Sequence, residues 1–365
     1  MAKKTSLKDI AQYVGVSTAL VSYVLNGKEK QARVSQQKVL EIRQAAKLLD
    51  YQPNLIAKSL RKGQTKTIGL IVADISNPFF ADLAKKVEEF ARELGYIVLF
   101  GSSDEQEYKS SYLIDVFLSR QVDAFIVCPV SGTENQIKKL QQTGKPVVLV
   151  DRYFPGLPAD SVRINNREIA MRAVEHLILG GRRNIALLSY QTDLAHINQR
   201  KSGYLKAMEK YGLAVNPELI MEVNYANLVP KVEQKMLAAF NLQDKVDGIL
   251  FATNSLAIAG LRVIENLGIK VPGDISVVSF DQSEVFDFYY APLTYIAQGI
   301  QSLAENAVLL VSKRLKEQIH ARQYMTTILD AKLIIRESSK VETSLQLNGS
   351  ISGLIQPELR AEKIG

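Results

Sequence analysis

The sequence predicts an α/β core preceded by a small all-α module, and two observations carry this prediction. From Thr67 onward, short apolar runs alternate with amphipathic stretches, which is the pattern of parallel strands and the helices that cover them. The excess positive charge lies instead within residues 1–62, which hold 12 Lys and Arg residues against four acidic residues. Because the net charge of the whole chain is +7, the rest of the chain is nearly neutral.

The module begins with two helix signals separated by a turn. Ser6 and Ser17 suit the N-caps of two helices, and Gly15 falls between them. Ala11, Gly15 and Val21 occupy the places where a helix-turn-helix needs a small residue, a residue tolerant of positive φ and a branched aliphatic residue. Many helical hairpins share this spacing, so the pattern alone leaves a helix-turn-helix and an ordinary hairpin equally open.

A third predicted helix begins at Ser35 and closes the core of the module. The basic excess of the module indicates a polyanionic partner, because neutralising phosphates releases condensed counterions and so drives binding. A solvated basic face without a partner is the alternative that charge alone leaves open.

Residues 51–64 join the module to the core. Pro53 suits the first turn of a helix, and Gly63 ends a stretch of roughly two turns. A helix this short is marginal in water by itself. A plain linker would not need the apolar residues of this stretch, so we interpret it as a hinge that becomes helical when DNA and a partner chain are present.

Seven apolar runs of the core are predicted strands, at residues 67–73, 96–102, 124–130, 146–151, 184–190, 248–253 and 275–281. The series is too long for one parallel sheet, which predicts two similar halves. Ligands of open α/β sheets bind beyond the carboxyl ends of the strands. Polar residues gather at those ends, namely Asp74, Asn77, Asp151, Arg152, Asn254 and Asp281.

Other classes of protein lack support in the sequence. The single cysteine, Cys128, lies in an apolar run, so neither a disulfide framework nor a metal cluster is predicted. The nucleotide, phosphate, zinc-protease and hydrolase motifs GxGxxG, GxxxxGK[ST], HExxH and GxSxG are absent, and the three histidines are dispersed. We therefore expect no enzymatic activity, no cofactor and no metal. No signal peptide or membrane span is predicted, which indicates a cytoplasmic protein.

Eight blocks, in order between about residues 6 and 338, resemble one family of proteins. They are "LKDIAQYVGVSTALVSYVLNG", "YQPNLIAKSL", "IGLIVADISNPFFADL", "VDRYFPGLPADSVRINN", "AVEHLILGGRRNIALL", "QRKSGYLKAME", "GILFATNSLAIAGLRVI" and "GIKVPGDISVVSFD". The chain thereby resembles the lactose-repressor and galactose-repressor (LacI/GalR) family of bacterial transcription regulators. The resemblance implies a homodimer that binds near-palindromic double-stranded operator DNA through a helix-turn-helix. It also implies that a small effector controls the affinity of this homodimer for DNA.

The resemblance also implies a domain organisation. The core resembles the type I periplasmic sugar-binding proteins, in which two Rossmann-like subdomains hold a ligand between them. The implied parts are a helix-turn-helix domain at 1–50, a hinge helix and linker at 51–65, a core at 66–340 and a C-terminal tail at 341–365 that we expect to be disordered. Within the core, the implied N-subdomain comprises 66–162 and 293–325, and the C-subdomain comprises 163–292 and 326–340.

The DNA-binding residues that the resemblance implies belong to two segments. In the recognition helix they are Ser17, Thr18, Ala19, Ser22, Tyr23 and Asn26, and in the hinge they are Asn54, Ala57, Lys58 and Leu60. Thr18 and Ala19 open the helix that reads bases in the major groove, whereas Ser17 and Ser22 are phosphate contacts or caps. Leu60 matches an apolar wedge for the minor groove.

The effector-binding residues that the resemblance implies are Asp74, Asn77, Phe79, Arg152, Arg200, Asn254 and Asp281. Phe79 either stacks on the ligand or is an ordinary core aromatic. Arg200 and Asp281 either contact the ligand or pair with each other, as a buried ion pair would in any fold. The expected effector is a small hydroxylated molecule, with a sugar or sugar derivative favoured over a purine.

The sequence departs from the family pattern at several positions. Tyr23 stands where the family commonly has arginine, and Ser255, Ser279 and Gln282 replace an aspartate, a glycine and a second aspartate. The first departure leaves two interpretations of Tyr23, as a DNA contact or as a side chain that packs on the module. The tail lacks sustained leucine heptads, so a dimer is expected and not a tetramer.

Two rival classes of function remain to be weighed. A transport solute-binding protein shares the core fold, but it would need a signal peptide and would not need the basic module. An enzyme would need catalytic motifs that the sequence does not contain.

Overall fold

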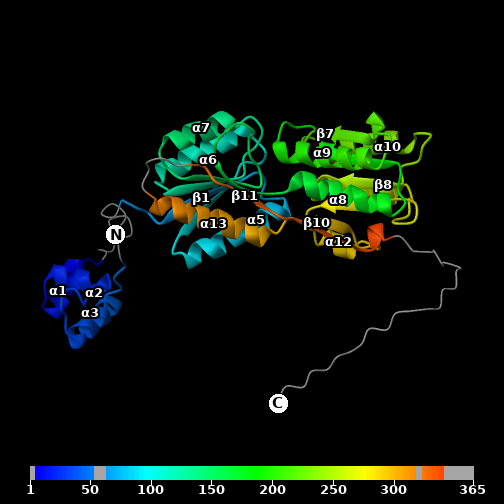
Figure 1. Cartoon of the computed structure of the whole chain (residues 1–365). Coiled ribbons are helices and arrows are strands. Elements are labelled where there is room, and N and C mark those ends of the chain that lie inside the picture. The colour runs from blue at the N-terminus through cyan, green and yellow to red at the C-terminus, as the bar shows by residue number, and fades with distance from the viewer. Residues whose placement is uncertain (1–4, 53–62, 318–322, 341–365) are drawn as a thin grey trace, which may run out of the picture. The chain divides into compact units, whose positions relative to one another are not determined.

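The computed structural model describes residues 5–52, 63–317 and 323–340, and the chain forms two compact units (Figure 1). The first unit comprises Met1–Thr67 with Gln121–Asp123, and the second comprises Ile68–Arg120 with Ala124–Gly365. The hinge positions and the C-terminal tail lie outside the described residues, so the predictions made for them remain predictions.

The first unit is built from three helices, α1 (Leu7–Val14), α2 (Thr18–Leu25) and α3 (Gln36–Leu48). Each predicted N-cap is confirmed, because the hydroxyls of Ser6, Ser17 and Ser35 accept hydrogen bonds from backbone N–H groups in the first turn. The core of the unit consists of apolar residues at helical spacing, Ile10, Ala11, Val21, Val24, Val39, Ile42 and Ala45.

Gly15 sets the angle between α1 and α2. Its φ of 69° lies in the left-handed region, where its N–H closes α1 by donating to the carbonyl of Ala11. Ala11 and Val21 are both buried, so the small and branched residues pack in this core as the helix-turn-helix pattern predicts.

The second unit contains two six-stranded sheets. The first has the order β11-β5-β4-β3-β1-β2, and its strands are β1 (Thr67–Val72), β2 (Ile97–Ser102), β3 (Ala124–Val127), β4 (Val147–Val150), β5 (Asp160–Ile164) and β11 (Thr326–Leu329). The second has the order β12-β10-β9-β8-β6-β7, and its strands are β6 (Ile185–Tyr190), β7 (Ile220–Val223), β8 (Gly248–Phe251), β9 (Ser276–Phe280), β10 (Thr294–Ala297) and β12 (Lys332–Ile334). Strands β1, β3, β4, β5 and β11 of the first sheet pair in parallel, as do β6, β7, β8, β9 and β10 of the second, and β12 is antiparallel to β10.

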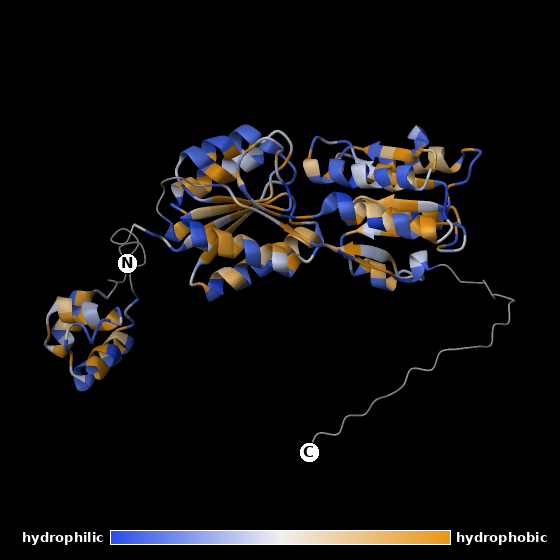
Figure 2. Cartoon of the chain, in the orientation of Figure 1, coloured by the Kyte–Doolittle hydropathy of each residue, from blue (hydrophilic) through white to orange (hydrophobic). Residues whose placement is uncertain are grey.

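Helices cover both sheets, as the near-continuous apolar strands require (Figures 1 and 2). Those of the first half are α5 (Pro78–Glu93), α6 (Glu107–Ser119), α7 (Glu134–Gln142) and α13 (Ile300–Lys316). Those of the second half are α8 (Asn166–Leu179), α9 (Ala195–Lys210), α10 (Leu228–Phe240), α11 (Asn254–Asn266) and α12 (Val285–Phe288), with short 3-10 turns at η1 (Pro217–Leu219) and η2 (Glu337–Ser339). The prediction of an α/β core with two similar halves is therefore confirmed.

The chain passes between the two sheets three times, after β5, β10 and β11. These crossings follow residues 164, 297 and 329, a few positions later than the 162, 293 and 325 implied by the resemblance. The difference arises because β5, β10 and β11 have only four or five residues each and carry no periodic apolar signal that would mark their ends. Among the described residues, no helix is long and apolar enough to span a membrane.

Close packing of α9 on α8 prepares the ligand site. A Cβ at Gly203 of α9 would lie only 2.3 Å from the backbone oxygen of Arg167 in α8, so only glycine fits where the two helices meet. This approach brings Arg200 of α9 within hydrogen-bonding distance of Asn166 of α8.

Candidate nucleic-acid interface and ligand pocket

In the first unit, α2 presents one face to solvent. Of the predicted DNA-contacting residues of this helix, five are exposed and Ser22 is half-buried, the exposed ones being Ser17, Thr18, Ala19, Tyr23 and Asn26. Val21 and Val24 lie on the opposite face and are buried in the core of the unit. An exposed helix on a basic unit suits insertion into the major groove of DNA.

Two of these residues also maintain the helix itself. Ser17 accepts the backbone N–H of Leu20 at 3.2 Å, and the amide nitrogen of Asn26 donates to the carbonyl of Ser22 at 2.7 Å. Tyr23 keeps 45% of its surface exposed, in contrast to 1% for its neighbour Val24. Within the unit, Tyr23 is therefore available for contact with a partner. Asn54, Ala57, Lys58 and Leu60 lie outside the described residues.

In the second unit, six of the seven predicted effector-binding residues lie beyond the carboxyl ends of strands or at the starts of the helices that follow, and Arg200 lies in the second turn of α9. Arg152 follows β4, and Asp281 follows β9. Asn77 caps the start of α5 by accepting the N–H of Phe79, and Asn254 is the first residue of α11. Asn77 and Asn254 contact each other directly, because the Asn254 amide nitrogen donates to Asn77 Oδ1 at 3.0 Å.

Asp74 and Phe79 lie at the edge of this group. The Asp74 carboxylate accepts the backbone N–H and the hydroxyl of Ser76, which orders the turn after β1. Phe79 is buried and packs edge-to-face on Phe80 at 5.0 Å between ring centres. The Arg152 guanidinium lies 5.2 Å from the centre of the Phe80 ring, so Phe79 adjoins the site through Phe80.

Arg152 is held by a carboxylate that sequence reasoning missed. Its two terminal nitrogens donate to Glu105 at 2.9 and 2.7 Å, a two-pronged pairing with both side chains largely buried. Burial opposes the charge of Arg152, but Glu105, with Tyr225 and Asp151, outweighs it and raises the pKa of Arg152 above its ordinary value. Arg152 therefore remains a cation.

Arg200 is among the largest fully buried side chains of the described residues, with 1% of its surface exposed. Nε donates to Asn166 Oδ1 at 2.8 Å and Nη1 donates to the Ala252 carbonyl at 2.7 Å, while the guanidinium lies 3.9 Å from the centre of the Phe280 ring. Burial lowers the pKa of Arg200 from its ordinary value, although Asp281 and Asp151 oppose that shift. Both Arg200 and Asp281 lie in the described part of the chain, and no ion pair within 4.0 Å joins them.

Two aspartates occupy equivalent places in the two halves. Asp151 follows β4 with φ of 65°, and Asp281 follows β9 with φ of 68°, so both turn sharply from the strand in the left-handed region that Asp tolerates. The Asp281 carboxylate accepts a short hydrogen bond from Gln298. Burial raises the pKa of Asp151 to about 6, with Arg152 and Arg200 opposing the rise and Asp281 and Glu105 adding to it. The charges of Arg152, Arg200, Asp281 and Glu105 therefore all lie close enough to Asp151 to influence its pKa.

Aromatic side chains and a histidine border the charged groups. The rings of Tyr190 and Tyr225 stack at 3.9 Å between centres with an interplanar angle of 16°. Burial raises the pKa of Tyr190 to about 12 and also raises that of Tyr225, so both hydroxyls stay protonated. Burial, and then repulsion from Arg152 and Arg200, lowers the pKa of His196 well below its ordinary value, which keeps this imidazole neutral.

Several buried polar atoms of this region have no hydrogen-bond partner among the described residues. They are Asp151 Oδ1, Arg152 Nε, Asn166 Nδ2, Ser189 Oγ, His196 Nδ1 and Gln298 Oε1. A buried polar atom without a partner is costly, and such atoms are rare in folded proteins. Both donors and acceptors of this region are therefore available for a ligand.

The raised pKa of Asp151 makes the stability of the second unit depend on pH. Between about pH 4 and 6 the native Asp151 binds a proton that the unfolded chain releases, so its ionisation destabilises the fold as pH rises and fully so above pH 6. Asp151→Asn carries no charge and tolerates the same φ. We expect it to be more stable than the parent by about 3 kcal/mol at pH 8, and by about half of that at pH 5.

Urea unfolding of both proteins at pH 5 and pH 8, without added ligand, measures this difference. A parent protein that is as stable as Asp151→Asn at pH 8 would contradict the argument, because it would mean that the Asp151 carboxylate is not destabilised by burial.

Some residues of the site gave no signal in the sequence. His196 precedes Arg200 by four residues in α9, so helical spacing could have placed it on the same face. Asp151 is among the polar residues at the predicted strand ends, but the resemblance implies no role for it. Glu105, Tyr225 and Gln298 lie in or beside connecting segments, and only the structure brings them to the site.

Residues 6–54 match the family model described as bacterial regulatory proteins, lacI family, and residues 174–339 match that of a periplasmic binding protein-like domain. The chain is 31% identical over 337 residues to the HTH-type transcriptional repressor PurR of Histophilus somni, covering 92% of this chain and 99% of the relative. The repressor of the same name from Aliivibrio salmonicida is 30% identical over 321 residues, covering 87% of this chain and 94% of the relative.

Solved structures show the same architecture. The transcription regulator CcpA of Lactococcus lactis is 25% identical with a TM-score of 0.67, covering 75% of this chain and 99% of that chain. The lac repressor dimer, bound to operator and the anti-inducer ONPF, is 22% identical with a TM-score of 0.80, covering 92% of this chain and 99% of that chain. The second likeness concerns the fold alone.

Proposed function

We propose that a small hydroxylated ligand controls the affinity of this chain for operator DNA, since the chain belongs to the lacI family of bacterial regulatory proteins and is a DNA-binding transcription repressor. The observation that carries the proposal is the cluster of buried polar atoms without partners in the second unit. We further propose the division inferred from the sequence, with DNA binding in residues 1–50, a hinge in 51–65 and ligand binding in 66–340. The protein then acts in the cytoplasm, on DNA, and without catalysis.

The charges of the site support a neutral ligand, with a sugar or sugar derivative as the proposed class. Two arginines face three carboxylates, those of Glu105, Asp151 and Asp281, so an added anion gains no net attraction. A sugar hydroxyl donates to a carboxylate or amide oxygen and accepts from an arginine or amide nitrogen, which matches the mixture of unpaired donors and acceptors. The stacked tyrosines add a flat apolar surface for the ring of a sugar.

A panel of ligands tests the proposed class. Calorimetry with the full chain should detect binding of at least one neutral mono- or disaccharide. The same compound should change the affinity of the protein for operator DNA in a band-shift assay. Guanine and hypoxanthine form the comparison set, because a purine base also stacks on aromatic rings and binds both donors and acceptors. Binding of a purine base and of no sugar would overturn the carbohydrate assignment while leaving ligand control intact.

We propose a homodimer as the DNA-binding form. Exposed apolar residues gather on β2, the edge strand of the first sheet, and on its neighbours, namely Leu94, Ile97, Phe100, Tyr108 and Tyr112. Apolar surface of this kind is unusual on a monomer and suits a second copy of the chain. A twofold dimer carries two copies of α2 and therefore requires an operator with two inverted half-sites.

Tyr23 should make the half-site of this operator differ from one read by arginine. Arginine can donate two hydrogen bonds to guanine O6 and N7, which contributes about 1 to 3 kcal/mol of discrimination. Tyrosine has one hydroxyl and a flat ring, so we propose that Tyr23 contacts a phosphate or a thymine methyl group. Selection from random DNA should give Tyr23→Arg a new guanine preference at one symmetric position in each half-site.

The parent protein selected from the same pool is the control. Identical motifs from the two proteins would mean that position 23 does not face the bases. The selected sequences also report symmetry, because a dimer enriches inverted repeats in both experiments.

A further inference from the structure

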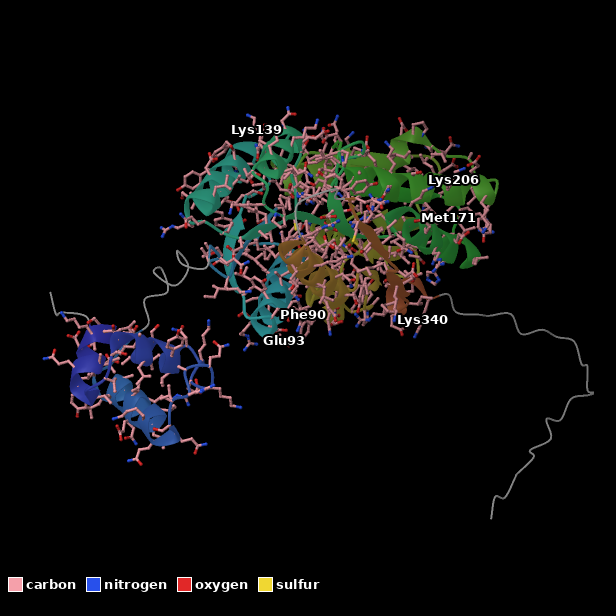
Figure 3. The ribbon with its side chains drawn as sticks, turned by 60° about the vertical axis from the view of Figure 1, so that its left-hand side comes forward. Phe90, Glu93, Lys139, Met171, Lys206 and Lys340 are labelled. Atoms are coloured by element: carbon pink, nitrogen blue, oxygen red, sulfur yellow. The ribbon has the colours of Figure 1, made fainter. Side chains whose placement is uncertain are left out.

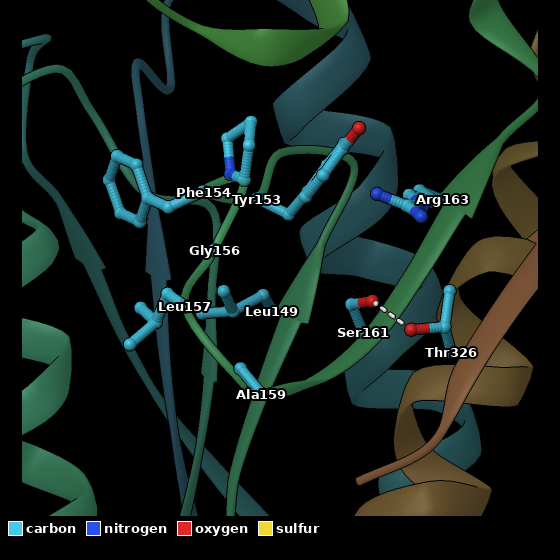
Figure 4. Close-up of a pocket in the computed structure, with 10 residues that line it drawn as sticks. Leu149, Tyr153, Phe154, Gly156, Leu157, Ala159, Ser161, Arg163 and Thr326 are labelled. Carbon is cyan, nitrogen blue, oxygen red and sulfur yellow. Dashed lines mark hydrogen bonds between the residues drawn. The ribbon is translucent and has the colours of Figure 1, made fainter.

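A separate cavity of about 190 Å³ lies in the second unit, beneath the loop that joins β4 to β5 (Figure 4). Its walls come from residues of this loop and from strands β4, β5 and β11. None of the residues that form the effector site described above lines this cavity. It therefore requires an explanation of its own.

Arg163 is the one charged side chain that lines the cavity. It is half-buried, and in the described part of the chain it makes neither a hydrogen bond nor an ion pair; its guanidinium carbon lies 3.6 Å from the centre of the Tyr153 ring. The other buried arginines of this half are neutralised, since Arg152 pairs with Glu105 and Arg314 with Asp160. Arg163 thus offers an unneutralised cation with its hydrogen-bond donors available.

Stacking on Tyr153 orients these donors. A guanidinium that lies on an aromatic face keeps the N–H groups of its edge free for a ligand in its own plane. Tyr153 is itself fixed, because its hydroxyl accepts a hydrogen bond from Gln199 Nε2 at 2.7 Å. The arrangement matches what a carboxylate needs for two parallel hydrogen bonds.

The remaining walls are apolar or carry hydroxyls. Phe154, Leu157 and Ala159 are buried apolar residues of the loop. On the strands, the hydroxyls of Ser161 and Thr326 lie 3.3 Å apart, and the dashed line in Figure 4 marks their hydrogen bond. One free cation, two hydroxyls and a few apolar side chains suit an organic monoanion that has a carboxylate and a small carbon skeleton.

We propose that this cavity binds a small organic carboxylate, with its carboxylate on Arg163 and its carbon skeleton against the loop. An apolar cavity of about 150 Å³ accommodates benzene, so 190 Å³ suits a molecule of about the size of benzoate. The site is distinct from the effector site, because none of its lining residues belongs to that site.

Calorimetry of the full chain with benzoate, and with benzamide as its uncharged isostere, tests this proposal. Benzoate should bind with Kd of about 1 mM, as expected for a ligand of this size, and at least about tenfold more tightly than benzamide because of the charge on Arg163. Arg163→Gln should reduce benzoate binding to the level of benzamide. Lys139→Gln removes an exposed charge from α7 in the same half (Figure 3) and should leave benzoate binding unchanged.

A second variant guards against an effect of Arg163 on folding. Ala159→Leu fills the cavity and keeps Arg163, so it should also abolish benzoate binding while circular dichroism remains that of the parent. Equal binding of benzoate and benzamide, or unchanged benzoate affinity in Arg163→Gln, would overturn the proposal. Because benzoate binding is measured without DNA, either result leaves the proposed control of operator binding untouched.

Discussion

A chain shortened to residues 66–365 is expected to lose operator binding completely. The deletion removes α2, whose exposed face includes Thr18 and Tyr23, and it removes the whole basic excess of the chain. For the full chain, affinity should fall steeply as salt rises, because each neutralised phosphate releases counterions. Band shifts at several salt concentrations measure both effects.

The shortened chain also provides its own control. Both sheets and every residue of the effector site lie within the second unit, so the deletion should preserve the circular dichroism of the core and its affinity for ligand. Unchanged DNA affinity of the shortened chain would contradict the assignment of DNA binding to the first unit.

The strands and helices that could be predicted are those with strong local signals. Ser6, Ser17 and Ser35 are N-caps because a hydroxyl is a common means of satisfying the free N–H groups of a first turn, and sequence alone identifies such positions. Continuous apolar runs identified seven strands with ends displaced by up to three residues. The other five strands, β5, β7, β10, β11 and β12, have only three to five residues each, and no continuous apolar run predicts them.

The effector site was predictable where geometry follows from topology. Strand ends of a parallel sheet meet at one edge, which predicts that Asn254 and Asp281 of the second sheet lie near each other. The family resemblance, and not topology, joined Arg152 of the first sheet to them. Glu105 was not predictable, because its pairing with Arg152 joins residues 47 apart in the chain. The stacking of Tyr190 on Tyr225 likewise depends on the path of the chain after β7, which no local pattern specifies.

Replacement of Arg200 by alanine should abolish the response to ligand while leaving operator affinity in the absence of ligand nearly unchanged. In the described part of the chain, Nε and Nη1 of Arg200 are used by Asn166 and Ala252, but Nη2 makes no hydrogen bond. Nη2 is therefore the atom that we expect to face the ligand. Arg200 belongs to the second unit, whereas the DNA-binding face lies on α2 of the first, so the substitution leaves the residues of that face unchanged.

Loss of the Arg200 cation also has a cost in stability. Asn166 Oδ1 and the Ala252 carbonyl lose the donor that satisfies them, and each buried acceptor left without a partner costs about 1 to 3 kcal/mol. Arg200→Lys is the matched variant, because it keeps the charge and most of the stability but lacks the planar fork. Its response to ligand should still fall at least about tenfold, the effect of losing about 1.4 kcal/mol.

Calorimetry with the active sugar and band shifts with operator separate binding from signalling in these variants. Loss of ligand binding in Arg200→Ala, with near-parental DNA affinity and an intact circular-dichroism spectrum, is the expected combination. Normal ligand binding by Arg200→Ala would place the ligand elsewhere. Alanine has no side-chain donor, so a ligand that accepts a hydrogen bond from Arg200 would be left with a buried acceptor without a partner. The direction of the response, release or recruitment of DNA, then follows from whether the ligand binds more tightly to the DNA-bound or to the free form.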